Sequence, residues 1–115
     1  MIGLPRLLFL LALLPATASA DEARDAVEWV AEADARCVQQ GGTLTGVRNR
    51  DRTRTVRVWL DRWYMGMRTA DRGRHDLPPD GPVRELGCSE TRQGRQHWTL
   101  EDARFLEPEA SPQGQ

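Results

Sequence analysis

The chain has 115 residues and a nearly balanced charge, with 16 basic and 17 acidic residues and a formal net charge of −1. This balance provides no overall positive field, so nucleic acid is not expected among its partners. Every Lys/Arg position is arginine, which excludes a lysine Schiff base or general base. The arginines are unevenly distributed, since residues 44–74 carry nine arginines and three aspartates. An anionic ligand is therefore expected to meet the middle of the chain.

Residues 1–20 have the three-part pattern of a cleaved signal peptide. One charge precedes an apolar run at 7–14, and the small residues at 16–20 end in an Ala-x-Ala cleavage pattern. The apolar run is too short to span a bilayer of about 30 Å, so no transmembrane segment is expected after cleavage. Cleavage after Ala20 predicts a mature protein that begins at Asp21 and is periplasmic or secreted.

Residues 21–106 have the length of a single small domain. The chain has two cysteines, Cys37 and Cys88, which are expected to form a disulfide in an exported protein. Closing a loop of about 50 residues stabilises a fold by roughly 4 kcal/mol through the lost entropy of the unfolded chain. Residues 107–115 are rich in proline, glycine, glutamine, serine and acids, and predict a disordered tail.

Residues 21–40 are predicted to form one amphipathic helix. Ala26, Val30, Ala33 and Cys37 recur at helical spacing. Acidic residues crowd the first turn, as the helix dipole favours, and the two glycines that follow the segment are a typical helix end. Because the apolar stripe consists mostly of small residues, this helix is expected to lie close against a sheet.

After residue 42 the hydrophobic period changes from 3.6 to 2. In the strongest run, Val56, Val58 and Leu60 project to one face, and Arg57, Trp59 and Asp61 project to the other. The alternation then changes phase, which predicts a bulge or chain reversal near residues 61–62 or at residue 66.

Shorter strands with well-marked turns follow the same pattern. The strands are predicted at 43–48, 75–77, 83–88 and 96–100, with turns at 49–53, 71–73, 78–82 and 90–94. The β-region 43–106 therefore favours a small antiparallel β-sandwich or barrel. Together with the predicted helix and disulfide, this indicates an α+β domain with its N-terminal helix packed on the β-region.

The most unusual local pattern is an arginine at every second position: Arg48, Arg50, Arg52 and Arg54. In an extended chain this spacing places all four guanidinium groups on one side, where they are suited to bind phosphate, sulfate or carboxylate groups. The competing interpretation is a solvated hairpin tip, because the residues between the arginines are asparagine, aspartate and threonine, which favour turns.

Trp59 lies between Arg57 and Asp61 on the face opposite the predicted core. An aromatic ring flanked by a cation and a carboxylate can stack on a sugar ring or anchor a protein partner. The alternative is that the predicted helix covers this face and makes Trp59 part of the core. These three residues, with the arginine-rich edge beside them, are the candidate binding residues.

Metal binding and catalysis have little support in the sequence. His75, His97, Met65 and Met67 are ligand types that suit copper, but they lack the local spacing of a metal site. The sequence contains neither a G-x-S-x-G elbow nor an H-E-x-x-H pair, and no glycine-rich phosphate cradle. We therefore expect no metal, no cofactor and no catalytic residues.

The resulting hypothesis is a small, exported, non-enzymatic binding protein. Its expected partner is an envelope or secreted protein, for which it acts as an inhibitor, an immunity factor or an assembly accessory. The alternative ligand for the same surface is an anionic envelope glycan or lipid head group. A small hydrolase is the third hypothesis.

Overall fold

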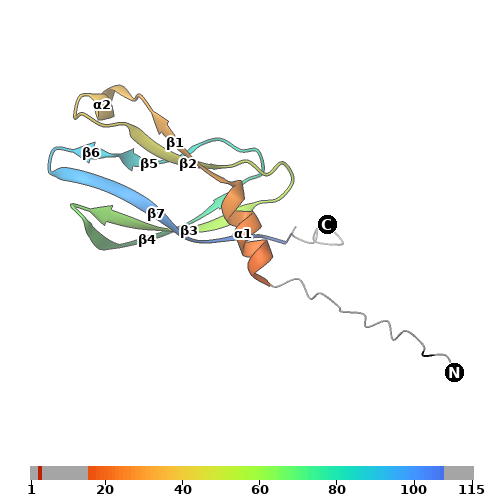
Figure 1. Ribbon diagram of the computed structural model, residues 1–115. Helices are drawn as coiled ribbons and strands as arrows, with labels where there is room; N and C mark the ends of the chain where they lie inside the picture. The colour runs from red at the N-terminus through yellow and green to blue at the C-terminus, as the bar shows by residue number, and fades with distance from the viewer. Residues whose placement is uncertain (1–2, 4–15, 108–115) are drawn as a thin grey trace, which may run out of the picture.

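The computed structural model describes residue 3 and residues 16–107, and Figure 1 shows that they form two sheets with a helix at one end. All the described strand pairs are antiparallel. The predictions of a mixed α and β protein with antiparallel sheets and one disulfide are therefore confirmed. Residues 1, 2 and 4–15 of the predicted signal peptide, and residues 108–115 of the predicted tail, lie outside the described residues.

One extended run of chain pairs with both sheets. The described elements, in chain order, are α1 (Ala16–Ala26), β1 (Val27–Glu32), α2 (Ala35–Val38), β2 (Leu44–Asn49), β3 (Val56–Tyr64), β4 (Met67–Leu77), β5 (Arg84–Cys88), β6 (Glu90–Thr91) and β7 (Gly94–Phe105). One sheet has the strand order β1-β2-β5, and the other has the order β4-β3-β7-β6. Ser89 alone separates β5 from β6, so the same run pairs first with β2 and then with β7.

The prediction of one continuous helix over 21–40 is wrong. α1 ends where β1 begins, and β1 pairs with β2 along its whole length. Val27 and Trp29 alternate with Glu28 at a period of two, which is typical of a strand. The small residues at helical spacing in the same segment are typical of a helix, so the sequence fits both structures. Pairing decides between the two, because the ladder with β2 provides backbone hydrogen bonds along β1 and places Val27 in the core, where it is 8% exposed.

The strand predictions agree with the structure over most of the β-region. The bulge expected near residue 61 is present as a register shift between β3 and β4. The reversal expected at Gly66 is present as a turn, in which Met65 and Gly66 have φ angles of 52° and 80°. The predicted strands at 43–48, 83–88 and 96–100 fall in β2, β5 and β7.

The predicted turn at 71–73 is wrong, because β4 continues through it without interruption. Gly73 pairs there with Leu60 on β3. A Cβ atom added to Gly73 would lie 2.8 Å from Nε2 of His75, so the missing side chain makes room for that imidazole. The glycine therefore serves packing within a strand rather than a change of chain direction.

The core is built from inward-facing side chains of both sheets and of α1. Val56, Val58 and Leu60 of β3 are at most 2% exposed, as their alternation predicted. Full burial of an aliphatic side chain of this size stabilises a fold by about 1.5–3 kcal/mol. The other buried members of the core are Ala23, Val27, Val47, Leu77 and Ala103.

α1 covers an edge of β7 that the described strands leave open. β6 pairs with β7 only through Arg95 and Gly94, and no described strand continues this ladder along the same edge. Arg24 of α1 donates from Nη1 to the carbonyl oxygen of Leu100 at 3.2 Å and from Nη2 to the carbonyl oxygen of Glu101. Covering a free edge in this way protects it from pairing with another chain.

The disulfide joins α2 to β5, and Cys37 and Cys88 have a sequence separation of 51 and Cα atoms 5.1 Å apart. Cys88→Ser is expected to lower the free energy of unfolding by about 2–5 kcal/mol, because the unfolded chain regains freedom that the bridge removes. Chemical denaturation measures this loss. Cys37→Ser is the matched control and should lose the same amount, and the double variant should lose no more. A Cys88→Ser protein as stable as the wild type would contradict this structural role.

Candidate functional site

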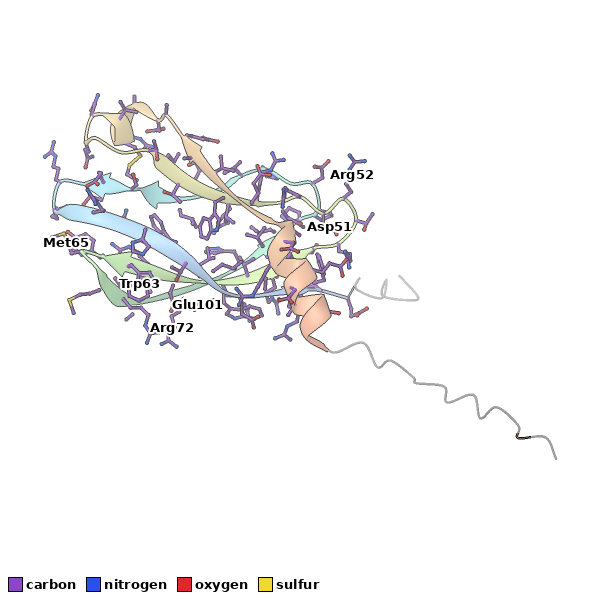
Figure 2. The ribbon with its side chains drawn as sticks, viewed as in Figure 1. Asp51, Arg52, Trp63, Met65, Arg72 and Glu101 are labelled. Carbon is purple, nitrogen blue, oxygen red and sulfur yellow. A yellow bond between two sulfur atoms is a disulfide. The ribbon has the colours of Figure 1, made fainter. Side chains whose placement is uncertain are left out.

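The candidate binding residues Arg57, Trp59 and Asp61 lie on the face of β3 that points away from the core. Antiparallel partners project to the same side of a sheet, so their neighbours on β4 and β7 extend this surface. Figure 2 shows Trp63, Arg72 and Glu101 on the side away from β1 and β2. We call this surface the outer face, and its residues are Arg57, Trp59, Asp61, Trp63, Arg68, Arg72, Arg74, Asp76, His97, Thr99, Glu101, Asp102 and Arg104.

Arg57 forms a two-pronged ion pair with Asp76 on β4. Its Nε atom lies 2.7 Å from Oδ1 and its Nη2 atom lies 3.0 Å from Oδ2. These hydrogen bonds lower the pKa of the Asp76 carboxyl and raise the pKa of the Arg57 guanidinium. The pair holds the guanidinium in a fixed orientation on the outer face.

Trp59 is half-buried, with one side of its ring toward a cation. The guanidinium carbon of Arg104 on β7 lies 5.2 Å from the centre of the ring, within range of a cation–π contact. Across the two ladders, Trp59 pairs with Arg74 and Asp102, both of which are exposed. The ring is thus surrounded by charged side chains and keeps part of its surface exposed.

Asp61 is placed differently from the other two candidates, since it is only 5% exposed. Arg68 and Arg72 of β4 lie over it, with nitrogen atoms 3.5 and 4.0 Å from its carboxylate oxygens. The negative charge of a carboxylate covered in this way is balanced by the protein's own arginines, and the carboxylate is not accessible to a ligand. Its role is to hold the two arginines at the surface of the outer face.

Trp63 extends the outer face, although it is not among the binding residues predicted from the sequence. Its ring stacks on that of His97 across the β3–β7 ladder, with centroids 5.8 Å apart and an angle of 6° between the planes. Its Nε1 donates to the Thr99 hydroxyl at 2.9 Å, and that hydroxyl donates to the Glu101 carboxylate at 2.7 Å. The signal was present in the sequence, because Trp63 continues the period-two series of Arg57, Trp59 and Asp61.

The four arginines at 48–54 are partly engaged by acidic side chains of the same chain. Arg48 and Arg50 both lie within 3.7 Å of the Glu28 carboxylate. Arg54 pairs with Asp51 at 2.8 Å and with Glu22 at 3.1 Å, and its guanidinium stacks on the ring of Phe105. Arg52 is exposed and forms no ion pair within the described residues. Figure 2 shows Arg52 and Asp51 at the end of the molecule opposite Met65.

A metal site and a membrane-spanning helix are two other features to consider in the described part of the chain. Within it, no group of three or more His, Cys, Asp and Glu side chains is arranged to hold a metal ion. None of its helices has the length and apolar character needed to cross a membrane. Comparisons with protein-family models, with curated proteins and with solved structures find no significant similarity to this chain. The functional argument therefore depends on the geometry of this molecule alone.

Arg57→Gln is expected to raise the pKa of Asp76 toward its ordinary value of 3.8, because the hydrogen bonds from Arg57 are the largest cause of its depression. An NMR titration of the Asp76 carboxyl measures this. Asp51 is the internal control, since Arg54 lowers its pKa and the substitution leaves that pair intact. An Asp76 pKa that does not change would show that the ion pair does not form in solution.

The same pair predicts a dependence of stability on pH. Because the pKa of Asp76 is lower in the folded than in the unfolded protein, the pair stabilises the fold above about pH 4, and this contribution is lost as the pH falls further. The melting temperature of the wild type should therefore drop more between about pH 7 and pH 2.5 than that of Arg57→Gln. Equal drops in the two proteins would show that the pair contributes nothing to stability.

Proposed function

We propose that this protein is exported and that its outer face binds a partner protein. The observation that supports this most directly is the presence of two half-buried tryptophans, Trp59 and Trp63, on one face of a sheet. Both rings lie among charged side chains held by ion pairs or hydrogen bonds. Tryptophan and arginine are enriched at the energetic centres of protein interfaces. Side chains that are already held in place lose little freedom on binding, which favours affinity.

The charge of the outer face favours a protein over an anionic glycan or lipid head group. Its five arginines and four acidic residues leave a net charge of only +1. The arginines at 48, 50 and 54 are also paired with acidic side chains of the same chain. A polyanion needs a concentrated positive field, whereas interleaved charges of both signs suit a protein surface of complementary pattern.

Export is supported by the signal-peptide pattern of residues 1–20 and by the disulfide, which is typical of oxidising compartments. The predicted cleavage site lies inside α1, between Ala20 and Asp21. Cleavage there leaves Ala23, which is fully buried in the core, and Arg24, which caps the edge of β7. These two contacts of the helix with the rest of the fold are therefore retained in the mature chain.

Cleavage would also change the surroundings of the outer face. Ser19 and Ala20 line a small hollow together with Asp102, Ala103 and Arg104 of β7. Two of these three β7 residues belong to the outer face, next to Trp59. Removal of residues 16–20 is thus expected to uncover this end of the proposed binding surface.

Mass spectrometry of the exported protein tests the cleavage. The expected N-terminal residue is Asp21, because the small residues before it match the specificity of signal peptidases. The cytoplasmic precursor, purified from cells whose export is blocked, is the reference and should begin at Met1. An exported protein that retains residues 1–20 would contradict the predicted cleavage.

Trp59→Ala tests the outer face. It is expected to weaken partner binding by at least about 2 kcal/mol, or about thirtyfold in Kd, and to lower the free energy of unfolding by less than about 2 kcal/mol. The immobilised protein captures partners from an envelope extract, and the purified partner is then titrated against each variant. Trp29→Ala is the matched control, since Trp29 is 42% exposed and lies on β1 in the other sheet.

A partner protein whose affinity falls for Trp59→Ala and not for Trp29→Ala would support the proposal. Equal losses in the two variants, or unfolding of Trp59→Ala, would overturn it. The alternative ligand has a different signature, because binding of an anionic glycan or lipid through several arginines weakens steeply with salt. If the protein is retained on vesicles that contain an anionic lipid, loses this retention as salt is added, and captures no protein, its ligand is the anionic lipid and not a partner protein.

A further inference from the structure

A cleft lies between the two sheets, on the side of β3 opposite the outer face. Its volume is about 370 Å³, and β3, β4, β5 and β7 all contribute to its lining. Pockets for small molecules begin at about 300 Å³, so the cleft has room for a compact ligand. The alternation of β3 places an arginine in this cleft. The inward-facing series Val56, Val58 and Leu60 continues with Arg62, which lies at the end of the core.

Arg62 is held in the cleft by a network of hydrogen bonds. Its Nε donates to Oε1 of Gln96 at 2.9 Å, and its Nη1 lies 3.2 Å from a carboxylate oxygen of Asp71. Gln96 is only 8% exposed, and its Nε2 donates to the carbonyl oxygen of Cys88 at 2.6 Å. This second bond orients the amide so that its oxygen faces Arg62. Among the described residues, Nη2 of Arg62 has no hydrogen-bond acceptor.

A second arginine and a histidine lie on the other walls of the cleft. The guanidinium of Arg84 on β5 is exposed and forms no ion pair or hydrogen bond with the described residues. His75 on β4 is half-buried, and its pKa is lowered first by burial and then by the positive charge of Arg84. The lowered pKa favours the neutral imidazole at neutral pH, and a neutral imidazole carries one hydrogen-bond donor.

The remaining wall of the cleft is apolar. Leu60, Leu86 and Trp98 line it, from β3, β5 and β7. β5 lies close to the indole, since a Cβ atom added to Gly87 would be 3.1 Å from Cη2 of Trp98. The cleft thus combines a fixed aromatic surface with two guanidinium groups that retain unused hydrogen-bond donors.

We propose that this cleft binds a small organic monocarboxylate, with its carboxylate between Arg62 and Arg84 and its apolar body against Trp98. Guanidinium groups bind carboxylates through parallel hydrogen bonds, and the aromatic surface suits a planar or aliphatic body. Arg72 also lines the cleft, but its guanidinium lies over Asp61 on the outer face, so the charges left to the cleft are Arg62 and Arg84 against Asp71 and Glu85. Because these charges balance, the cleft suits a ligand with a single negative charge better than a more highly charged anion. The site shares only Arg72 with the outer face, and it does not depend on the proposed protein partner.

Benzoate is the probe that tests this assignment, with benzamide as its uncharged analogue and inorganic phosphate as a more highly charged anion. Benzoate is expected to cause saturable NMR shifts of the Trp98 indole N–H and of the His75 ring, and benzamide is expected to cause none. Arg84→Gln should weaken benzoate binding at least about tenfold, because one charged hydrogen-bond donor is lost. Arg74→Gln is the matched control, since Arg74 lies on the outer face, and it should bind benzoate like the wild type.

The ring of His75 provides a second readout. Its charged neighbours in the cleft are Arg62 on β3, Asp71 and Arg72 on β4, and Arg84 and Glu85 on β5. A bound carboxylate neutralises the positive charge of Arg84, so the pKa of His75 should rise when benzoate saturates the site. The pKa of His75 should also rise in the Arg84→Gln variant without benzoate, because that positive charge is removed. The ring resonances of His97 on the outer face should not respond to benzoate.

Several results would overturn the site. Equal shifts with benzamide would show that the carboxylate is not recognised, and the lack of a saturable shift at about 20 mM benzoate would exclude useful affinity. An equal loss for Arg74→Gln and Arg84→Gln would show that binding depends on general charge. Phosphate binding tighter than benzoate binding would overturn the assignment to a monocarboxylate. Trp59→Ala should leave benzoate binding unchanged, which separates this test from that of the outer face.

Discussion

The register of β3 is the constraint on which the rest of the structure depends. This strand pairs with β4 on one side and with β7 on the other, so its two faces determine the two faces of the larger sheet. Val56 and Val58 are completely buried on one face, and Arg57 and Trp59 lie on the other. A shift of one residue would exchange the faces and bury arginines without partners, at a cost of several kcal/mol. The core and the proposed binding surface are therefore consequences of the same register.

The fold brings the acidic and the arginine-rich segments of the chain together, so that many of their charges form ion pairs. Acidic residues of the N-terminal segment face arginines of the 48–54 run, through the pairs of Glu22 with Arg54 and of Glu28 with Arg48. Exposed pairs of this kind contribute about 0–1 kcal/mol each, so their effect on stability is small. Their effect on recognition is larger, because they reduce the positive field that a polyanion would need.

Local patterns predicted the structure well where one period was dominant. The alternation at 55–61 correctly identified the buried and outward residues of β3, and the two cysteines correctly indicated the disulfide. The prediction of one helix over 21–40 failed because a helical and a strand period coexist in this segment. Pairing with β2 makes Val27–Glu32 a strand. The prediction of a turn at 71–73 is wrong because glycine is common in chain reversals, whereas Gly73 accommodates the ring of His75 within a strand.

The order of residues along the chain was therefore sufficient to determine the core face of β3, the cysteine pair and the outward positions of Arg57 and Trp59. Only the tertiary structure showed that Asp61 is covered by arginines and that Arg62 and Arg84 line one cleft. The physical reason is that periodicity reports the direction of a side chain relative to its own strand. Which side chains meet depends on bulges, on strand registers and on the crossing at Ser89, and these are decided by pairing between segments far apart in sequence.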